Sequence, residues 1–170
     1  ALQTSDVQTD YIGGEGTGTG SGGGGVGTGF AGGTSYLSVS FTVTAPIRYS
    51  LEGFISADLG FNHASVILSG LNGAIVHEEV GGYVGYFGGV LFTGPEGHAG
   101  TLDTGDYTIT AEASANDDSS TSPMAIFDFA LTLTESVGDF NGDSRVDAGD
   151  VDQLTATIRA GSGDSEFDLD

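Results

Sequence analysis

The sequence predicts an all-β protein: an antiparallel β-sandwich, jelly-roll-like, with a glycine-rich arm before it and an acidic loop with a short helix after it. Two observations predict the sandwich. Seven segments between residues 35 and 134 show the two-residue period of a half-buried strand, and Gly, Asn and Asp residues separate them. No helical period precedes residue 148. Seven strands with short connections are typical of a sandwich.

Composition changes twice along the chain and divides it into three parts. Residues 1–33 form an N-terminal extended and glycine-rich arm, residues 34–136 carry the strand pattern, and residues 137–170 hold the acidic loop and the helix. A chain of 170 residues has room for one domain of ordinary size with appendages. We therefore expect one β-sandwich flanked by two smaller units.

The arm combines a strand-like segment with a run of glycine. Residues 13–33, "GGEGTGTGSGGGGVGTGFAGG", have the composition of a flexible linker. The residues before them, "LQTSDVQTDYI", can extend as a strand. Strand addition joins two chains through backbone hydrogen bonds and needs no large side chains, so the arm is suited to pairing with a neighbouring subunit. The alternative is a tether that lies on its own domain.

The first predicted strand, residues 35–44, places apolar side chains on one face and hydroxyl groups on the other. Its apolar face consists of Leu37, Val39, Phe41 and Val43. Further strands are predicted at residues 47–57, 64–70, 73–80, 83–92, 106–115 and 125–134. The last has the clearest alternation, with one side formed by Ala125, Phe127, Phe129, Leu131 and Leu133. One face of these strands is expected to be buried and the other solvated.

One segment indicates where the protein works. "GTLDTGDYTITAEA" resembles the turn-then-strand signature of secreted bacterial β-sandwich domains, including those of surface proteins that end in a sorting tail. The sequence starts at Ala1 rather than methionine, which suggests either a removed leader or a boundary cut from a longer chain. Together with the acidity of the chain, these features predict an extracellular or cell-surface protein.

The charge of the chain excludes two classes of partner. Lysine is absent, and Arg48, Arg145 and Arg159 stand against 24 acidic residues, which gives a formal net charge of -21. Nucleic acid and anionic membrane surfaces both require a basic face, so neither is an expected partner. No apolar run approaches the roughly 20 residues that a membrane-spanning helix needs. Cysteine is absent too, which leaves no thiolate for a metal site.

Residues 139–150, "DFNGDSRVDAGD", carry oxygen donors at the spacing of an EF-hand calcium loop. Calcium prefers six to eight oxygen ligands, and such a loop supplies them from alternating positions. The expected ligands are Asp139, Asn141, Asp143, the backbone carbonyl of Arg145, Asp147 and Asp150. Ser144 stands where glycine is usual, and Asp150 is shorter than the usual glutamate, so we expect a weaker Ca²⁺ site. The alternative is a solvated acidic turn.

A helix is predicted directly after this loop. Val151, Leu154 and Ile158 fall on one helical stripe, Asp150 suits the N-terminal end of the helix dipole, and Gly161 is a stop signal. A calcium loop followed but not preceded by a helix resembles half of a type I dockerin, over residues 138–170. The resemblance implies a second repeat that begins at Asp168 and Asp170, which would make these residues a possible second metal site, and a cohesin-like protein as partner.

The sequence does not indicate an enzyme. It contains no combination of nucleophile and base, and no pair of tuned acids, that is typical of a catalytic site. His63, His77 and His98 are expected to be strand or loop residues rather than metal ligands, because no second histidine stands at ligand spacing. Tryptophan is absent, and Tyr83 and Tyr86 are the close tyrosine pair outside the core pattern. Sugar binding therefore has little support.

Two functions fit these features. The first is a self-assembling subunit of an extracellular fibre or matrix, joined to copies of itself by the N-terminal arm and by calcium. The second is a dockerin-bearing module that attaches to a cohesin-containing cell-surface complex. We favour the fibre, because the places that bind cohesin in the family hold small residues here, namely Ala148, Gly149, Thr155 and Ala156.

Overall fold

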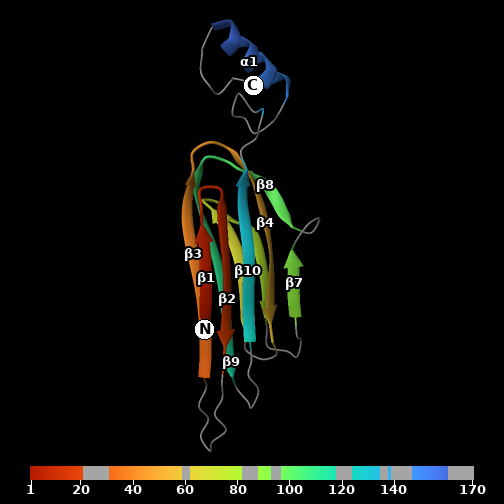
Figure 1. Ribbon diagram of the computed structural model, residues 1–170. Helices are drawn as coiled ribbons and strands as arrows, with labels where there is room; N and C mark the ends of the chain where they lie inside the picture. Colours follow the sequence, from red (N-terminus) through yellow and green to blue (C-terminus); the bar gives the residue numbers. More distant parts are fainter. Residues whose placement is uncertain are drawn as a thin grey trace, which may run out of the picture.

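The computed structural model describes residues 1–20, 31–58, 62–81, 88–92, 97–117, 124–134, 138 and 147–160. Its strands form two antiparallel sheets that pack face to face (Figure 1). The described residues contain one helix, α1 (Ala148–Ala160), which lies beyond the end of the sandwich at which the last strand stops. The prediction of an all-β sandwich is confirmed.

Sheet A has six strands and sheet B has four. The strands of sheet A are β1 (Leu2–Val7), β2 (Tyr11–Thr19), β10 (Met124–Thr134), β4 (Ile47–Ala57), β7 (Gly88–Phe92) and β8 (His98–Leu102), in the order β1-β2-β10-β4 with both β7 and β8 beside β4. Sheet B has the order β3 (Ala31–Val43), β9 (Gly105–Asp117), β5 (His63–Gly70), β6 (Gly73–Gly81).

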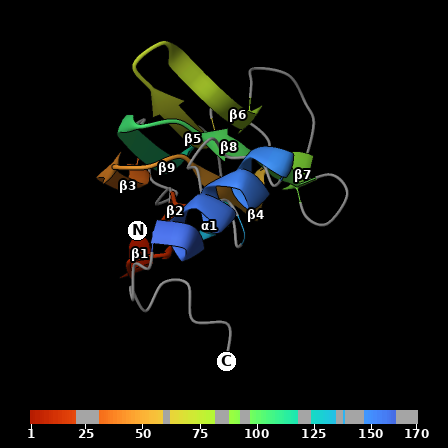
Figure 2. The same cartoon turned by 90° about the horizontal axis from the view of Figure 1, so that it is seen from above.

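The strand order is that of a jelly roll. β7 pairs with Gly53–Ala57 and β8 with Ile47–Leu51, so the two are halves of one interrupted edge strand. If β7 and β8 are counted as one strand and β1 is left out, the two sheets have the strand orders β2-β10-β4-β7/β8 and β3-β9-β5-β6. The chain alternates between the two sheets in the way that a jelly roll does. Seen from above, the strands of the two sheets lie in two layers (Figure 2).

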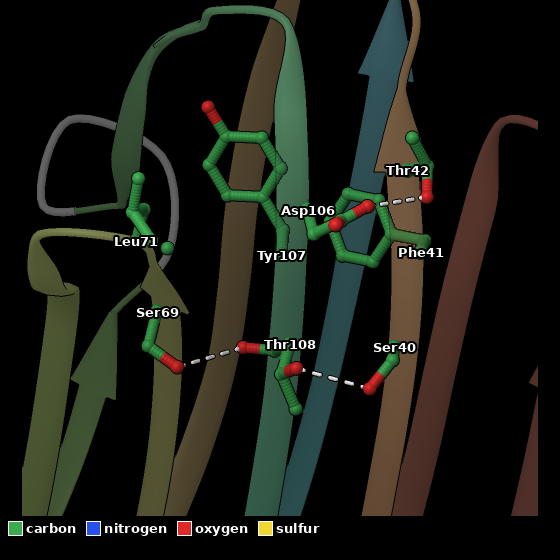
Figure 3. Close-up of a pocket in the computed structure, with 9 residues that line it drawn as sticks. Ser40, Phe41, Thr42, Ser69, Leu71, Asp106, Tyr107 and Thr108 are labelled. Carbon is green, nitrogen blue, oxygen red and sulfur yellow. Dashed lines mark hydrogen bonds between the residues drawn. The ribbon is translucent and has the colours of Figure 1, made fainter.

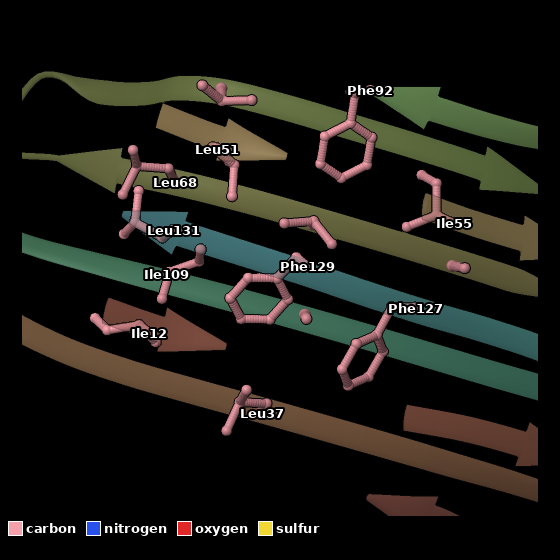
Figure 4. Packing of buried hydrophobic residues seen from close by; sticks show 14 of the residues in the cluster. Ile12, Leu37, Leu51, Ile55, Leu68, Phe92, Ile109, Phe127, Phe129 and Leu131 are labelled. Atoms are coloured by element: carbon pink, nitrogen blue, oxygen red, sulfur yellow. The ribbon is translucent and has the colours of Figure 1, made fainter. Parts of the chain in front are cut away.

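The core fills the space between the sheets and follows the predicted alternation (Figure 4). Alternate residues of β10 are buried, as are the inward residues of β4 and β9. The largest fully buried apolar side chains are Phe92, Phe127, Leu51, Ile55, Leu68, Leu102, Ile109, Leu131 and Val66. Because such burial stabilises by about 25 cal/mol per Å² of apolar surface, this single core is the main source of stability.

The boundary of the sandwich differs from the one predicted at residue 34. Residues that the sequence assigned to the arm form β1 and β2, and β2 pairs along its length with β10 in the interior of sheet A. Glycine makes this possible: a Cβ at Gly16 would lie 2.4 Å from the Phe127 ring, and one at Gly14 would lie 2.4 Å from Leu37. The space beside these glycines is therefore filled by side chains from neighbouring strands. Residues 21–30 lie outside the described part of the chain.

Hydrogen bonds join the two sheets at both edges of the sandwich. At one edge the Ser35 hydroxyl of β3 donates to the backbone oxygen of Leu2 in β1, over 3.1 Å. At the other edge, Glu78 Oε1 of β6 lies 2.6 Å from His98 Nε2 of β8. These contacts fix how the edge strands of one sheet lie against those of the other.

Candidate metal-binding site

The predicted calcium loop is only partly covered by the structure. Asp139, Asn141, Asp143 and Arg145 lie outside the described residues, as do Asp168 and Asp170 of the possible second site. The last two predicted donors of the loop, Asp147 and Asp150, are described. Asp147 directly precedes α1 and Asp150 lies in its first turn.

Asp147 and Asp150 form a reciprocal cap at the start of α1. The Asp147 carboxylate accepts a hydrogen bond from the backbone N–H of Gly149 over 2.7 Å. In return, the Asp150 carboxylate accepts one from the backbone N–H of Asp147, also over 2.7 Å. This is the geometry of a capping box, in which two side chains satisfy backbone donors that a helix start leaves without partners. Both carboxylates also stand at the positive end of the helix dipole.

Asp150 is the buried member of this pair, with 2% of its surface exposed. Burying a carboxylate is costly unless hydrogen bonds or a cation compensate for the lost water. The hydrogen bond from Asp147 supplies part of that compensation. A carboxylate has about four lone-pair sites, so an oxygen that caps the helix leaves room for a cation at the same group. The cap and calcium binding are therefore compatible.

The cap alone is enough to explain why aspartates stand at positions 147 and 150, with no metal ion bound. Asp is among the preferred residues at a helix start whether or not an ion is bound. Within the described ranges, no group of three or more His, Asp or Glu side chains is arranged to hold a metal ion. Asp147 and Asp150 stand at the ninth and twelfth positions of the predicted loop, and α1 begins between them at Ala148.

α1 leaves apolar side chains exposed. Val151 and Ile158, which the sequence places on one stripe with Leu154, are each 61% exposed, while Leu154 is half-buried. Arg159 lies in the last turn, where a cation suits the helix dipole. No helix in the described part of the chain is long and apolar enough to cross a membrane.

The histidines lie on strands β5, β6 and β8, and each contacts a glutamate of β6. His63 and His77 lie 3.3 and 3.0 Å from the two carboxylate oxygens of Glu79, and His98 contacts Glu78 as described above. Sequence reasoning did not find these pairs. His77 and Glu79 share a face of β6 by their spacing, but nothing in the sequence brings His98 to Glu78, which belongs to the other sheet.

A groove lies at the tip of the β5–β6 hairpin, beside the turn before β9 (Figure 3). Phe41 and Tyr107 stack there, with ring centroids 5.8 Å apart, and Leu71 lies across from them. The cavity of about 470 Å³ also contains hydroxyl and carboxylate groups that bond to one another, Ser40 to Thr108 and Thr42 to Asp106. Tyr83 and Tyr86 lie outside the described residues.

Comparisons with known proteins do not identify a function. No family model matches the chain, and no curated protein matches it. Among solved structures, TmCBM61 in complex with β-1,4-galactotriose is similar, with 16% identity and a TM-score of 0.29 over 76% of this chain and 67% of that one. A structure of infectious bursal disease virus Gx strain has 9% identity and a TM-score of 0.29, over 79% of this chain and 32% of that one.

Proposed function

We propose that the chain is a non-catalytic extracellular module in which the β-sandwich carries a calcium-binding loop and helix. The observation that supports this most strongly is the reciprocal cap between Asp147 and Asp150. It starts a helix at the position that an EF-hand loop beginning at Asp139 requires. The same pair brings a buried carboxylate to the end of the loop, where a cation would offset its burial.

Charge supports the same function. The chain has a net charge of -21, and residues 139–150 hold five side chains whose oxygens are predicted to bind calcium. Calcium bound there would neutralise local repulsion and would stabilise the folded form, because an unfolded loop holds the ion poorly. The acidity and the resemblance to secreted β-sandwich domains together support an extracellular location, where calcium is abundant.

Thermal melting in calcium and in chelator tests this function. We expect chelation to lower the melting temperature of α1 and its loop, and Asp139→Ala combined with Asp143→Ala to remove that dependence. A control that replaces two acids outside the loop, Asp103→Ala with Asp152→Ala, should keep it. Identical melting of the unmodified chain with and without chelator would contradict the proposal.

Docking through α1 is one role in which we propose the calcium unit acts, and it would use the exposed apolar stripe of the helix, since small residues stand at the places that bind cohesin in dockerins. Val151 and Ile158 present exposed apolar side chains on one stripe of this helix, and we propose them as the contact surface. The resemblance to a dockerin half-repeat suggests a cohesin-like protein as the partner. Binding of the calcium-loaded chain to a purified cohesin domain should be lost in Val151→Ser with Ile158→Ser, and retained in Asp152→Ala. Absence of binding by the unmodified chain would contradict this role.

Self-assembly into a fibre is the second candidate, and β1 is the observation that favours it. All six residues of β1 are exposed, and β1 is the edge strand of sheet A. β2 is paired within its own sandwich, so strand exchange would involve β1 rather than the whole arm. Deleting residues 1–8 should abolish polymers while the sandwich still melts cooperatively. A chain that stays monomeric in calcium with β1 intact would exclude the fibre.

A further inference from the structure

We infer that Asn72 is a site of spontaneous modification, where the side chain cyclises onto the backbone nitrogen of Gly73 and yields isoaspartate. The chain has four asparagines, and two of them precede glycine, Asn72 and Asn141. Among the described residues, Asn72 alone precedes glycine. This inference does not depend on calcium binding.

The β5–β6 turn leaves the reacting groups open to water. Leu71 and Asn72 form the turn between the paired residues Gly70 and Gly73. Asn72 is exposed, and its neighbour Leu71 is 98% exposed. A Cβ placed on Gly73 would meet no atom within 4 Å, so that side of the residue is open to solvent. Gly73 also has a φ of 111°, a backbone conformation that favours glycine. The turn therefore favours glycine after Asn72, and glycine has no side chain that would hinder ring closure.

Asn62 provides the contrast within the same protein. It is 1% exposed, its side-chain amide donates to the backbone oxygen of Asp58, and its side-chain oxygen accepts from the backbone of Asn116. These bonds hold the amide group away from the next backbone nitrogen. Asn62 is also followed by His63, whose side chain crowds that nitrogen as glycine does not.

The reaction balances with water as the only co-reactant. The backbone nitrogen of Gly73 loses its proton to solvent and attacks Cγ of Asn72, which expels ammonia and closes a five-membered succinimide. Water then opens one of the two ring carbonyls. Opening at Cγ gives aspartate, and opening at the backbone carbonyl gives isoaspartate, in which the main chain runs through the former side chain.

The modification would change the groove at this end of the sandwich. Asn72 and Gly73 line a second cavity, of about 530 Å³, together with Asp103, Asp106 and Tyr107. A new carboxylate would add a negative charge beside two existing ones. Isoaspartate would also add a methylene to the main chain of a tight turn, and turn length sets hairpin register. We therefore expect the end of β6 nearest the turn to loosen.

Peptide mapping of the intact protein tests the inference. The folded chain and a synthetic peptide of residues 69–76 are incubated in separate samples of the same mildly alkaline buffer. The protein is then digested, and both samples are analysed for the mass change from amide to acid and for isoaspartate. We expect the two to convert at similar rates, Asn62 to keep its amide, and Asn72→Gln to remain unmodified. Conversion of the free peptide alone, or of the protein only in denaturant, would overturn the inference. Conversion of Asn141, the other asparagine that precedes glycine, is measured separately on its own proteolytic peptide.

Discussion

His98 and Glu78 join the two sheets across the open edge of the sandwich, with 2.6 Å between Nε2 and Oε1. We predict that Glu78→Ala lowers the free energy of unfolding by about 1 kcal/mol, because a partly buried hydrogen bond is lost. Glu79→Ala is the matched control on the same strand. Its contacts with His63 and His77 are more exposed, so it should cost less than about 0.5 kcal/mol. If urea unfolding gave the two variants the same loss in free energy of unfolding, the contact between the sheets would contribute no more stability than the exposed contacts of Glu79.

Gly16 should not tolerate a side chain. A Cβ there would lie 2.4 Å from the Phe127 ring and 2.5 Å from Ser35 Oγ. We predict that Gly16→Ala destabilises the sandwich by about 1–3 kcal/mol through overpacking. At an unobstructed position the same change stabilises by reducing the entropy of the unfolded chain, so the sign of the effect is diagnostic. Glu15→Ala, on the exposed face of β2, is the control, and a more stable Gly16→Ala protein would contradict the packing described here.

Asp147 should stabilise α1 even without calcium. Its carboxylate accepts from the backbone of Gly149, and replacing a capping aspartate by alanine typically costs about 0.5–2 kcal/mol of helix stability. We predict faster amide hydrogen exchange along α1 in Asp147→Ala, with exchange in the sandwich strands unchanged. Asp152→Ala, one turn further along the helix, should have a smaller effect. Equal exchange in the two variants would argue against the cap.

Burial of Tyr49 should make the sandwich sensitive to alkali. Loss of water around its hydroxyl raises the pKa of Tyr49 above its ordinary value of 10.0. The unfolded chain therefore loses this proton at lower pH than the folded chain. The stabilisation is complete below pH 10.0 and declines as pH rises through the folded pKa. We predict that Tyr49→Phe is less sensitive to alkaline unfolding than the unmodified chain, and an identical pH profile would contradict this.

Strands with apolar alternation were predictable, and strands without it were not. The segment 47–57 coincides with β4, and 125–134 coincides with β10 to within one residue, because their inward side chains are large and apolar. β2 was missed because its inward face is glycine. The alternation of glycine at residues 14, 16 and 18 was the available signal. β8 is only five residues long and lacks a clear period.

The candidate site was predictable in its local part only. The apolar stripe of Val151, Leu154 and Ile158 predicted a helix that starts near Asp150, and α1 begins at Ala148. The reciprocal bonding of Asp147 and Asp150 follows from their spacing, since a capping box also places its two side chains three residues apart. The contact of Glu78 with His98 depends on how the two sheets stack, and no local pattern encodes it.

Calorimetric titration of calcium into the chelator-treated chain is the most direct test of calcium binding. We predict a saturable binding isotherm for the unmodified chain and its loss in Asp139→Asn with Asp143→Asn, which remove charge from two predicted ligands without shortening them. Asp103→Asn with Asp152→Asn, equal in charge change but outside the loop, should bind as the unmodified chain does. An unmodified chain that shows no binding, or a loop variant that binds as well as the control, would contradict the proposed function.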